Sequence, residues 1–345
     1  MSDRPCEEEA CRASDGPGGD ATRGDPLPRR ERGQVLLVGA LALAVLLLAL
    51  VPVYNAVFTT DSADVGGREG VPDGASAYER STLEAAQRLA IRTGHGRTHP
   101  DNGSVASAFE PAFENYTRIH DESAVTGTGT YVNATFDGNA PGTQYGVRVV
   151  QNRSGHLDKP TSGGPGNWHL VRNSSRTQLG WFTVRLDVSN LSESDPFVVR
   201  VYNGTDEVRL AVESDGGSND VSVQLTGSVG TMSEDVTCDS RAGEVVIDLY
   251  RGSADRGDCT FTGLDVVEGP VSVWVRNGSS AYGVYELVVR NGDGLEPSIH
   301  RCTDDHTDPC WTPTLWQLSL RSHVRSGGTD YTSRVNVSVY GEGGA

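Results

Sequence analysis

Four residues in the C-terminal part of the chain have the side-chain types of a metal site. His300, Cys302, His306 and Cys310 place a Cys-x3-His-x3-Cys core beside a second histidine. Thiolate and imidazole ligands suit zinc or copper. The spacing differs from the Cys-x2-Cys of common zinc sites, and the alternative is a disulfide that closes an acidic loop. We favour the disulfide, so we predict no metal and no cofactor.

The sequence contains none of the short catalytic motifs that carry a recognisable mechanism. It has no Gly-x-Ser-x-Gly and no His-Glu-x-x-His, and its single lysine, Lys159, does not follow a phosphate-binding glycine loop. A hydrolase that uses two carboxylates far apart in the chain would leave no local motif. We therefore predict a protein that is not an enzyme, with that one enzymatic class left open.

Nine Asn-x-Ser/Thr sequons, the acceptors of N-glycosylation, occur after position 100 and none occurs before it. One sequon means little, but nine in the same part of the chain favour a glycoprotein. We expect some sequons, particularly those inside strands, to stay unmodified. The sequon asparagines are Asn102, Asn115, Asn133, Asn152, Asn173, Asn190, Asn203, Asn277 and Asn336.

The six cysteines fall into two groups. Two lie in the first residues, at Cys6 and Cys11, and four lie in the C-terminal half. An even number of cysteines in an oxidising compartment favours disulfides. Four cysteines allow three pairings, and closing the shortest loops costs the least chain entropy. We therefore prefer the disulfides Cys238–Cys259 and Cys302–Cys310.

An uncharged stretch near the N-terminus has the length of a membrane span. No charged residue occurs from Gly33 to Thr60, and Val35 to Val53 is an almost unbroken run of Leu, Val and Ala. At 1.5 Å per residue that run spans about 28 Å, close to the ~30 Å hydrocarbon core of a bilayer. A soluble helix of this length would show a polar face. We predict a transmembrane helix over residues 34–58.

The flanking charges orient this segment. Arg29, Arg30 and Arg32 precede it, whereas the first charge after it is Asp61. The positive-inside rule then leaves a cytoplasmic tail, 1–33, and an extracellular remainder. The tail is rich in Gly, Pro and charged residues and is expected to be disordered. The alternative is a cleaved signal peptide, for which the apolar run is too long.

The charge composition is acidic and almost free of lysine. There are 46 Asp and Glu against 29 Lys and Arg, and the net charge is −17. Such a surface suits a protein in multimolar salt, where charge repulsion is screened within about 3 Å at 1 M. A GC-rich genome, which favours arginine over lysine, is the alternative. The excess of acid argues against a nucleic-acid partner.

Two short helices are predicted after a linker over residues 59–77. The capping box Ser81-Thr82-Leu83-Glu84 opens the first, which Gly94 could end. The second runs from Ser104 to about His120 in spite of a proline at position 111. Together they occupy residues 78–120.

From about residue 127 the apolar pattern changes to a period of two. About eleven short strands, rich in Val and aromatic residues, are separated by Gly, Asn and Asp turns. This pattern predicts a mainly β fold, an antiparallel β-sandwich over residues 121–345. One large sandwich and two stacked ones that divide near residue 230 are equally compatible. Asn203-Gly204 predicts a hairpin with a type I′ turn.

The start of the apolar run also carries a resemblance. Arg32-Gly33-Gln34 and the apolar residues after it resemble the start of a group of haloarchaeal single-pass, pilin-like membrane-anchored proteins of unknown function. The resemblance covers roughly residues 30–65. It implies processing by a prepilin peptidase between Gly33 and Gln34. Bacterial-type pilins carry Glu where this chain has Val38, and the outer domain is large for an archaeal pilin.

Two functions from different classes remain. The first is a membrane-anchored cell-surface glycoprotein with a structural or interaction role, as a minor pilin-like subunit of a salt-adapted archaeon. Its partners would be membrane lipid and other pilin-like or envelope proteins. The second is a cell-surface ligand- or metal-binding β-sandwich module, which rests on the His300–Cys310 loop and the five tryptophans.

Overall fold

The computed structural model describes residues 73–128, 131–159, 166–172, 178–216, 220–254, 259–302, 308–326 and 329–340. These belong to the second of two compact units, Glu69–Ala345. The predicted tail, the transmembrane helix over 34–58, the processing residues Gly33 and Gln34, and linker residues 59–72 lie outside the described residues. In the described part, no helix combines the length and apolar character that a membrane span requires.

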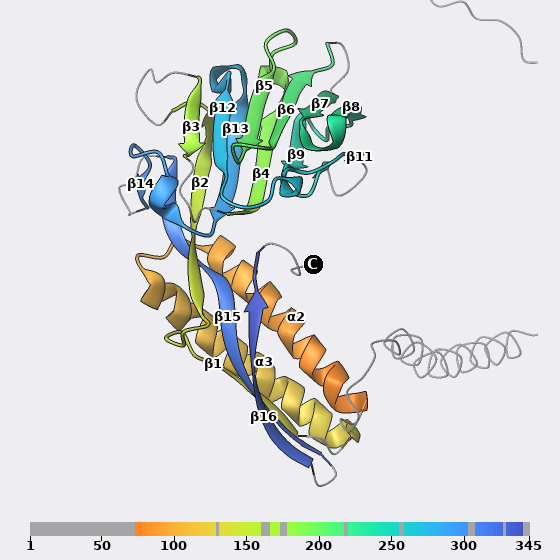
Figure 1. The fold of residues 1–345 in the computed structure, drawn as a ribbon, viewed down its shortest axis with the longest axis vertical. Helices are drawn as coiled ribbons and strands as arrows, with labels where there is room; N and C mark the ends of the chain where they lie inside the picture. Colours follow the sequence, from red (N-terminus) through yellow and green to blue (C-terminus); the bar gives the residue numbers. More distant parts are fainter. Residues whose placement is uncertain are drawn as a thin grey trace, which may run out of the picture. The chain divides into compact units, whose positions relative to one another are not determined.

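The described residues form two helices followed by antiparallel β-sheets, which confirms the predicted mainly β class (Figure 1). The helices are α2 (Asp73–Gly96) and α3 (Asn102–Thr128). The earlier strands are β1 (Tyr131–Phe136), β2 (Gln144–His156), β3 (Trp168–Val171), β4 (Leu179–Asp187), β5 (Phe197–Tyr202), β6 (Glu207–Ser214), β7 (Val221–Gly227) and β8 (Met232–Cys238). The later strands are β9 (Glu244–Asp248), β10 (Ser253–Ala254), β11 (Cys259–Thr260), β12 (Ser272–Arg276), β13 (Tyr282–Val289), β14 (His300–Arg301), β15 (Cys310–Ser326) and β16 (Thr329–Ser338).

Helix α2 is longer than the sequence predicted. It begins at Asp73 rather than at the expected capping box, so residues 73–77 are helical and not linker. The Ser81 and Thr82 hydroxyls both donate to the Tyr78 carbonyl, a bond that such side chains make inside a helix. Tyr78 packs against strand residues from the far end of the chain. That tertiary contact, which no local pattern encodes, favours the additional helical turns.

Helix α3 also extends beyond its predicted end. The Asp101 carboxylate caps its start by accepting a hydrogen bond of 2.7 Å from a backbone N–H of the first turn. The helix continues to Thr128, so the β region begins at Tyr131 and not at 121. Pro111 is accommodated on the exposed side of the helix.

The strands form two sheets. The larger has the order β1-β15-β2-β13-β4-β9-β10-β11, with β14 and β16 also paired to β15. The smaller has the order β3-β12-β5-β6-β7-β8. All pairings are antiparallel except that of β14 with β15. There is one pair of sheets in the described residues rather than two stacked sandwiches that divide near residue 230.

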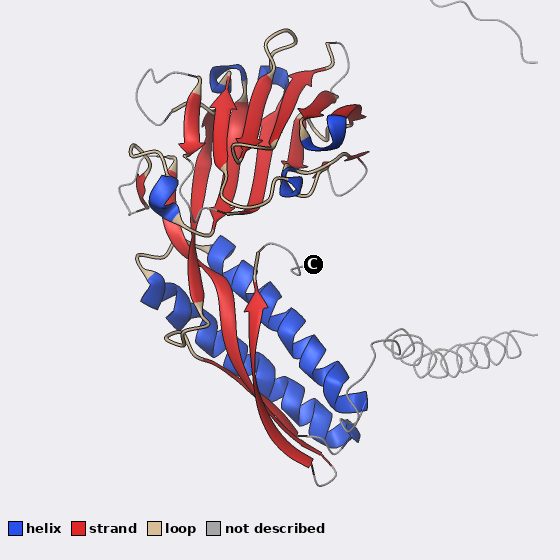
Figure 2. Ribbon diagram, in the orientation of Figure 1, coloured by secondary structure: helices blue, strands red, loops and turns tan. Residues whose placement is uncertain are grey.

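The two sheets share one core. Phe182 and Leu186 of the larger sheet meet Val199, Leu210 and Val273 of the smaller sheet, and all are almost fully buried. We call this part the two-sheet body. It comprises β2 to β14 and the first half of β15 (Figure 2).

A second core lies between the helices and the end of the larger sheet. Ala90 of α2 and Phe109 and Phe113 of α3 pack against Phe136 of β1 and Leu320 of β15. Each fully buried phenylalanine contributes roughly 2 kcal/mol through the area that it removes from water. We call this part the arm. It comprises α2, α3, β1, β16 and residues 317–326 of β15.

Strand β15 joins the arm to the body. Its first half, from Cys310 to Leu315, pairs with β2 inside the body. Its second half pairs with β1 on one side and β16 on the other. One continuous strand therefore fixes the two cores relative to each other.

The predicted hairpin at Asn203 is present, but its turn is different. Strands β5 and β6 are joined by the four residues 203–206, not by a two-residue type I′ turn. Gly204 has a φ of +97°, whereas Asn203 is not in the left-handed region. The Asn203 side chain instead accepts hydrogen bonds from the backbone of Thr205 and Asp206. An Asx-type turn thus replaces the predicted one.

Candidate functional site

The structure joins the cysteines of the body in the preferred pairs. Cys238 is bonded to Cys259, and Cys302 is bonded to Cys310. The second disulfide uses both thiol groups of the candidate metal cluster. His306 lies outside the described residues, and His300 is exposed on β14. No group of metal-ligating side chains with the geometry of a site occurs among the residues that the structure describes.

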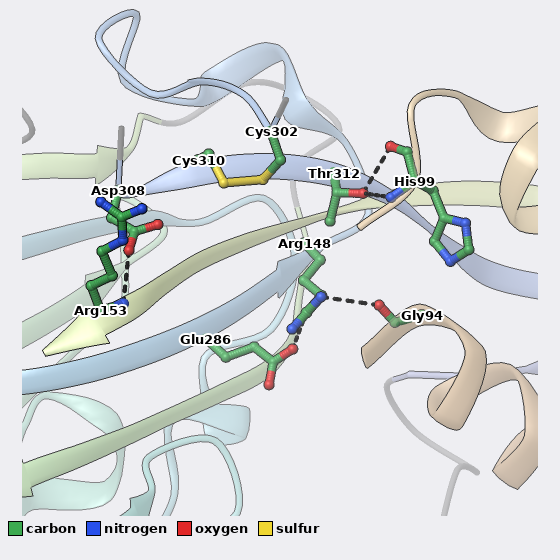
Figure 3. Close-up of a disulfide and its surroundings, with 9 residues drawn as sticks. All are labelled: Gly94, His99, Arg148, Arg153, Glu286, Cys302, Asp308, Cys310 and Thr312. Atoms are coloured by element: carbon green, nitrogen blue, oxygen red, sulfur yellow. Dashed lines mark hydrogen bonds and ion pairs between the residues drawn. A yellow bond between two sulfur atoms is a disulfide. The ribbon is translucent and has the colours of Figure 1, made fainter. Parts of the chain in front are cut away.

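Beside the disulfide, a buried arginine connects the body to the helices (Figure 3). Arg148 of β2 is only 6% exposed. Its Nε bonds the carboxylate of Glu286 on the neighbouring strand β13, and its Nη1 donates to the carbonyl of Gly94 at 3.2 Å. That carbonyl is in the last turn of α2, where carbonyl groups lack helical partners and the helix dipole favours a cation.

The same carboxylate also binds a side chain from α2. His95 Nδ1 lies 2.9 Å from Glu286 Oε1, and His95 Nε2 lies 2.8 Å from the Tyr340 hydroxyl. That hydroxyl also lies 3.3 Å from the hydroxyl of Thr314 on β15. The chain of contacts Arg148–Glu286–His95–Tyr340 therefore links strands β2 and β13, helix α2 and the residues after β16. We call it the junction network.

Burial and charge set the ionisation of this network. Burial by itself would raise the pKa of Glu286, but its hydrogen bond with His95 and the charges on His95 and Arg148 outweigh it. The pKa of Glu286 therefore lies below its ordinary value. Burial raises the pKa of Tyr340, so its hydroxyl stays protonated.

The loop between the helices is held by a second pair of contacts. The Thr312 hydroxyl on β15 accepts a hydrogen bond of 2.7 Å from the His99 N–H and donates one of 3.0 Å to the His99 carbonyl (Figure 3). Burial lowers the pKa of the His99 ring, which keeps it neutral. Its Nε2 lies 3.1 Å from the Thr93 carbonyl. These bonds satisfy backbone groups that the short loop would otherwise bury unpaired.

Gly94 permits the close approach of α2 to β15. A Cβ atom at this position would lie 2.2 Å from Oγ1 of Thr314. The sequence predicted a helix-ending role for Gly94, but α2 continues to Gly96. Its lack of a side chain serves helix–strand contact instead.

These contacts position structural elements rather than a reacting group. The ionisable side chains of the junction network are each bonded to another member of the network or to a helix end. Sequence reasoning missed the network, because Arg148 lies in an alternating strand and gave no motif. One signal was available. Arg148 is the charged residue within the otherwise apolar run Val147-Arg148-Val149-Val150, and a charge in such a run needs a partner when the strand is buried.

Glu286 leads to a prediction about acid stability. Replacing Glu286 with Gln removes a charge-assisted contact and is expected to cost about 2 kcal/mol near neutral pH. The folded-state pKa is below the ordinary value near 4.5, so the ionised carboxylate stabilises the fold above that value. This stabilisation is lost as the pH falls through the folded-state pKa. Urea unfolding near neutral pH and at about pH 3 would show it as a difference that shrinks in acid. A difference that does not change with pH would contradict it.

The structure divides the predicted glycosylation asparagines into two sets. In three of them the side-chain nitrogen, to which a glycan would be linked, is bound in a turn. Asn190 Nδ2 donates to Asp187 at 2.7 Å, Asn203 Nδ2 to the carbonyl of Glu268 at 2.9 Å, and Asn277 Nδ2 to Asp195 at 2.6 Å. These asparagines have a local structural role whether or not they are modified.

In the second set the amide nitrogen makes no hydrogen bond within the described residues. This set contains Asn102, Asn115, Asn133, Asn152 and Asn336. Three of its members lie inside strands, at Asn133 in β1, Asn152 in β2 and Asn336 in β16. The strand sequons thus have amides that no turn engages within the described residues, and which sequons carry glycans stays a prediction. Asn173 lies outside the described residues.

Comparison with known proteins gives one partial match. A model of a family of unknown function (DUF7261) matches residues 29–147. The matched stretch covers the apolar run, both helices, β1 and the first residues of β2, and it is less than half of the chain. No curated protein and no solved structure shows a significant match. Over its N-terminal part, the chain is therefore similar to a family whose function is unknown.

Proposed function

We propose that this chain is a membrane-anchored cell-surface glycoprotein with a structural or interaction role. The observation that carries the proposal is the pairing of all four cysteines after the apolar run, Cys238–Cys259 and Cys302–Cys310. Disulfides persist in oxidising compartments and are rare in the cytosol. An uncharged run over 34–58, preceded by arginines, would then anchor the domain to the membrane with its body outside.

The contacts between arm and body support a mechanical role. Strand β15 passes through both parts, and the buried Arg148 bonds a body carboxylate and a helix end at once. Such contacts hold the helices in one orientation against the body. The helices and the body would therefore behave as one stiff unit, which suits a structural or interaction role.

The finer version of the proposal is a minor pilin-like subunit of a salt-adapted archaeon. Its support is the Arg32-Gly33-Gln34 start and the acid-rich, lysine-poor composition. In this version the apolar helix packs beside other pilin-like helices or envelope proteins after processing. Membrane lipid surrounds it before assembly.

The test is the N-terminus and intact mass of the protein purified from its own membranes. For a processed subunit we expect a chain that begins at Gln34, with added mass from glycans. A Gly33→Val variant should keep residues 1–33, while Gly39→Ala, a control inside the apolar run, should be processed normally. A wild-type chain that retains 1–33 would end the pilin-like version and leave an uncleaved anchor.

A second readout tests the anchored glycoprotein itself. The membrane fraction should contain the protein, and its four body cysteines should resist alkylation until a reductant is added. Recovery in the soluble cell contents, with those cysteines free, would overturn the proposal. The ligand-binding alternative has no comparable support, because its tryptophans are dispersed. Trp181 of the larger sheet packs against His95, and Trp274 of the smaller sheet packs against His169 on the neighbouring strand.

A further inference from the structure

The arm has one sheet face that the helices do not cover. Along β1, β15 and β16, Phe136, Leu318 and Leu320 point toward α2 and α3. The alternate residues point to the opposite side, as the period of two requires. Three cross-strand rows lie on that outward face: Thr135–Arg321–Arg334, Asn133–His323–Thr332 and Tyr131–Arg325–Asp330.

This face is basic in an acidic protein. Arg321, Arg325 and Arg334 are exposed, and none has an ion pair within the described residues. The one carboxylate in these three rows, Asp330, lies 2.7 Å from the His323 ring. Arg321 and Arg334 stand directly opposite each other, an arrangement that is destabilising when nothing lies between the charges. The arginines of this face therefore lack compensating negative charges among the described residues.

The same face carries two sequons whose amide nitrogens make no hydrogen bond among the residues that the structure describes. Asn133 stands opposite His323, and Asn336 stands opposite Ser319. Each is therefore a diagonal neighbour of Arg321, at a separation of about 7–8 Å. The two asparagines are on β1 and β16, the strands on either side of β15. Arg321 thus lies between the two positions at which sugars would be attached.

We propose that the outward face of the arm is covered by this chain's own glycans, linked to Asn133 and Asn336, and that Arg321, Arg325 and Arg334 bind anionic groups of those sugars. Guanidinium groups bind carboxylate or sulfate oxygens in a bidentate fork. An anionic sugar group beside Arg321 and Arg334 would convert an opposed pair of like charges into a favourable cluster. The inference rests on the proposed glycoprotein and deepens it.

Covalent attachment is the reason to favour a glycan over other anionic occupants. A sugar chain linked to Asn133 or Asn336 is held beside the arginines at a high effective concentration. Anionic lipid headgroups and the acidic surface of a second copy would have to reach the face past those sugars. Both remain outcomes that the experiment can distinguish.

The first measurement is the occupancy of each sequon in the native full-length protein. Glycopeptide mass spectrometry should find Asn133 and Asn336 modified and should find at least one carboxylate- or sulfate-bearing sugar on each. Bare asparagines at both positions would overturn the inference. So would glycans composed entirely of neutral sugars.

The second measurement is a sign change in thermal stability. In the glycosylated chain, Arg321→Gln should lower the melting temperature by about 2 °C, the scale of an exposed ion pair in a domain of this size. In a chain made glycan-free on this face by Asn133→Gln and Asn336→Gln, the same substitution should leave the melting temperature unchanged or raise it. It then relieves repulsion with Arg334.

A matched control is available on the smaller sheet. Arg209 stands directly opposite Arg200, and its diagonal neighbours on β5 and β7 include no sequon asparagine. Arg209→Gln should shift the melting temperature equally in the glycosylated and the glycan-free backgrounds. An Arg321→Gln effect that is likewise equal in both backgrounds would overturn the glycan contact.

The two alternative occupants of the outward face, anionic lipid and a second copy of the chain, would give different results. Binding of the glycan-free protein to vesicles that contain anionic phospholipid, lost in Arg321→Gln and shared by the native glycoprotein, would assign the face to lipid. Self-association abolished by Arg321→Gln would assign it to a second copy. Either result overturns the glycan inference while the protein is still a membrane-anchored glycoprotein. Recovery of an unmodified protein from the soluble cell contents would instead reject the function on which the inference rests.

Discussion

Replacing Arg148 with alanine is expected to lower the free energy of unfolding by about 3 kcal/mol. The guanidinium is 6% exposed and bonds both Glu286 and the last turn of α2. Removing one partner of a buried ion pair leaves the other charge without compensation, which costs about 3–5 kcal/mol. The lower end applies because the Glu286 side chain is 21% exposed and keeps its contact with His95. Urea unfolding, followed by the fluorescence of the tryptophans, would measure the change.

Two further variants make this prediction specific. Arg185 is an exposed arginine on β4 of the same sheet, and Arg185→Ala should change stability by less than about 0.5 kcal/mol. The double variant Arg148→Met with Glu286→Leu removes both charges together and should recover most of the loss. A cost below about 1 kcal/mol for Arg148→Ala would show that the junction network does not hold the helices on the body.

Removing the disulfide Cys238–Cys259 is expected to cost about 3 kcal/mol. The two cysteines are 21 positions apart, and opening a loop of that length returns considerable entropy to the unfolded chain. The bond also joins β8, the last strand of the smaller sheet, to β11, the last strand of the larger one. The disulfide therefore holds these two edge strands together, although no backbone hydrogen bonds of a shared sheet join them. The double variant Cys238→Ala, Cys259→Ala tests this in urea, with a reductant on the wild type as an independent route.

The other disulfide serves as the comparison. Cys302 and Cys310 are only 8 positions apart, so the same entropy argument gives about 2.5 kcal/mol for Cys302→Ala with Cys310→Ala. Cys302 directly follows β14 and Cys310 is the first residue of β15, so this bond links two neighbouring parts of the larger sheet rather than two different sheets. We therefore expect the smaller loss there. A larger loss of stability for Cys302→Ala with Cys310→Ala than for Cys238→Ala with Cys259→Ala would show that the Cys302–Cys310 bond limits the opening of the body.

The family match has a structural consequence for the arm. The matched residues end at 147, yet the helices cannot bury Phe109 and Phe113 without Leu318 and Leu320, which lie near the other end of the chain. The arm is therefore complete only when β15 and β16 return to it. The body is inserted between β1 and these returning strands.

The sequence by itself determined the local features of this protein. The change from helical periodicity to alternation placed two helices before a set of strands, because each pattern depends only on residues a few positions apart. The preferred cysteine pairs are present as well, because short loops cost the least entropy to close. Asn277 shows the same local control: it adopts a φ of +55° directly after β12, a conformation that Asn tolerates in turns.

Only the tertiary structure decided the non-local features. The first turns of α2 are stabilised by Tyr78 against Val324, and no capping rule anticipates a contact between residues so far apart. Arg148 is buried only because α2 lies against β2, where its guanidinium bonds the Gly94 carbonyl. The arginine face required the register of β1, β15 and β16, since a shift of one residue would turn Arg321 toward the helices. Periodicity states which residues share a face of one element, but the partner of that face depends on packing energies summed over the whole chain.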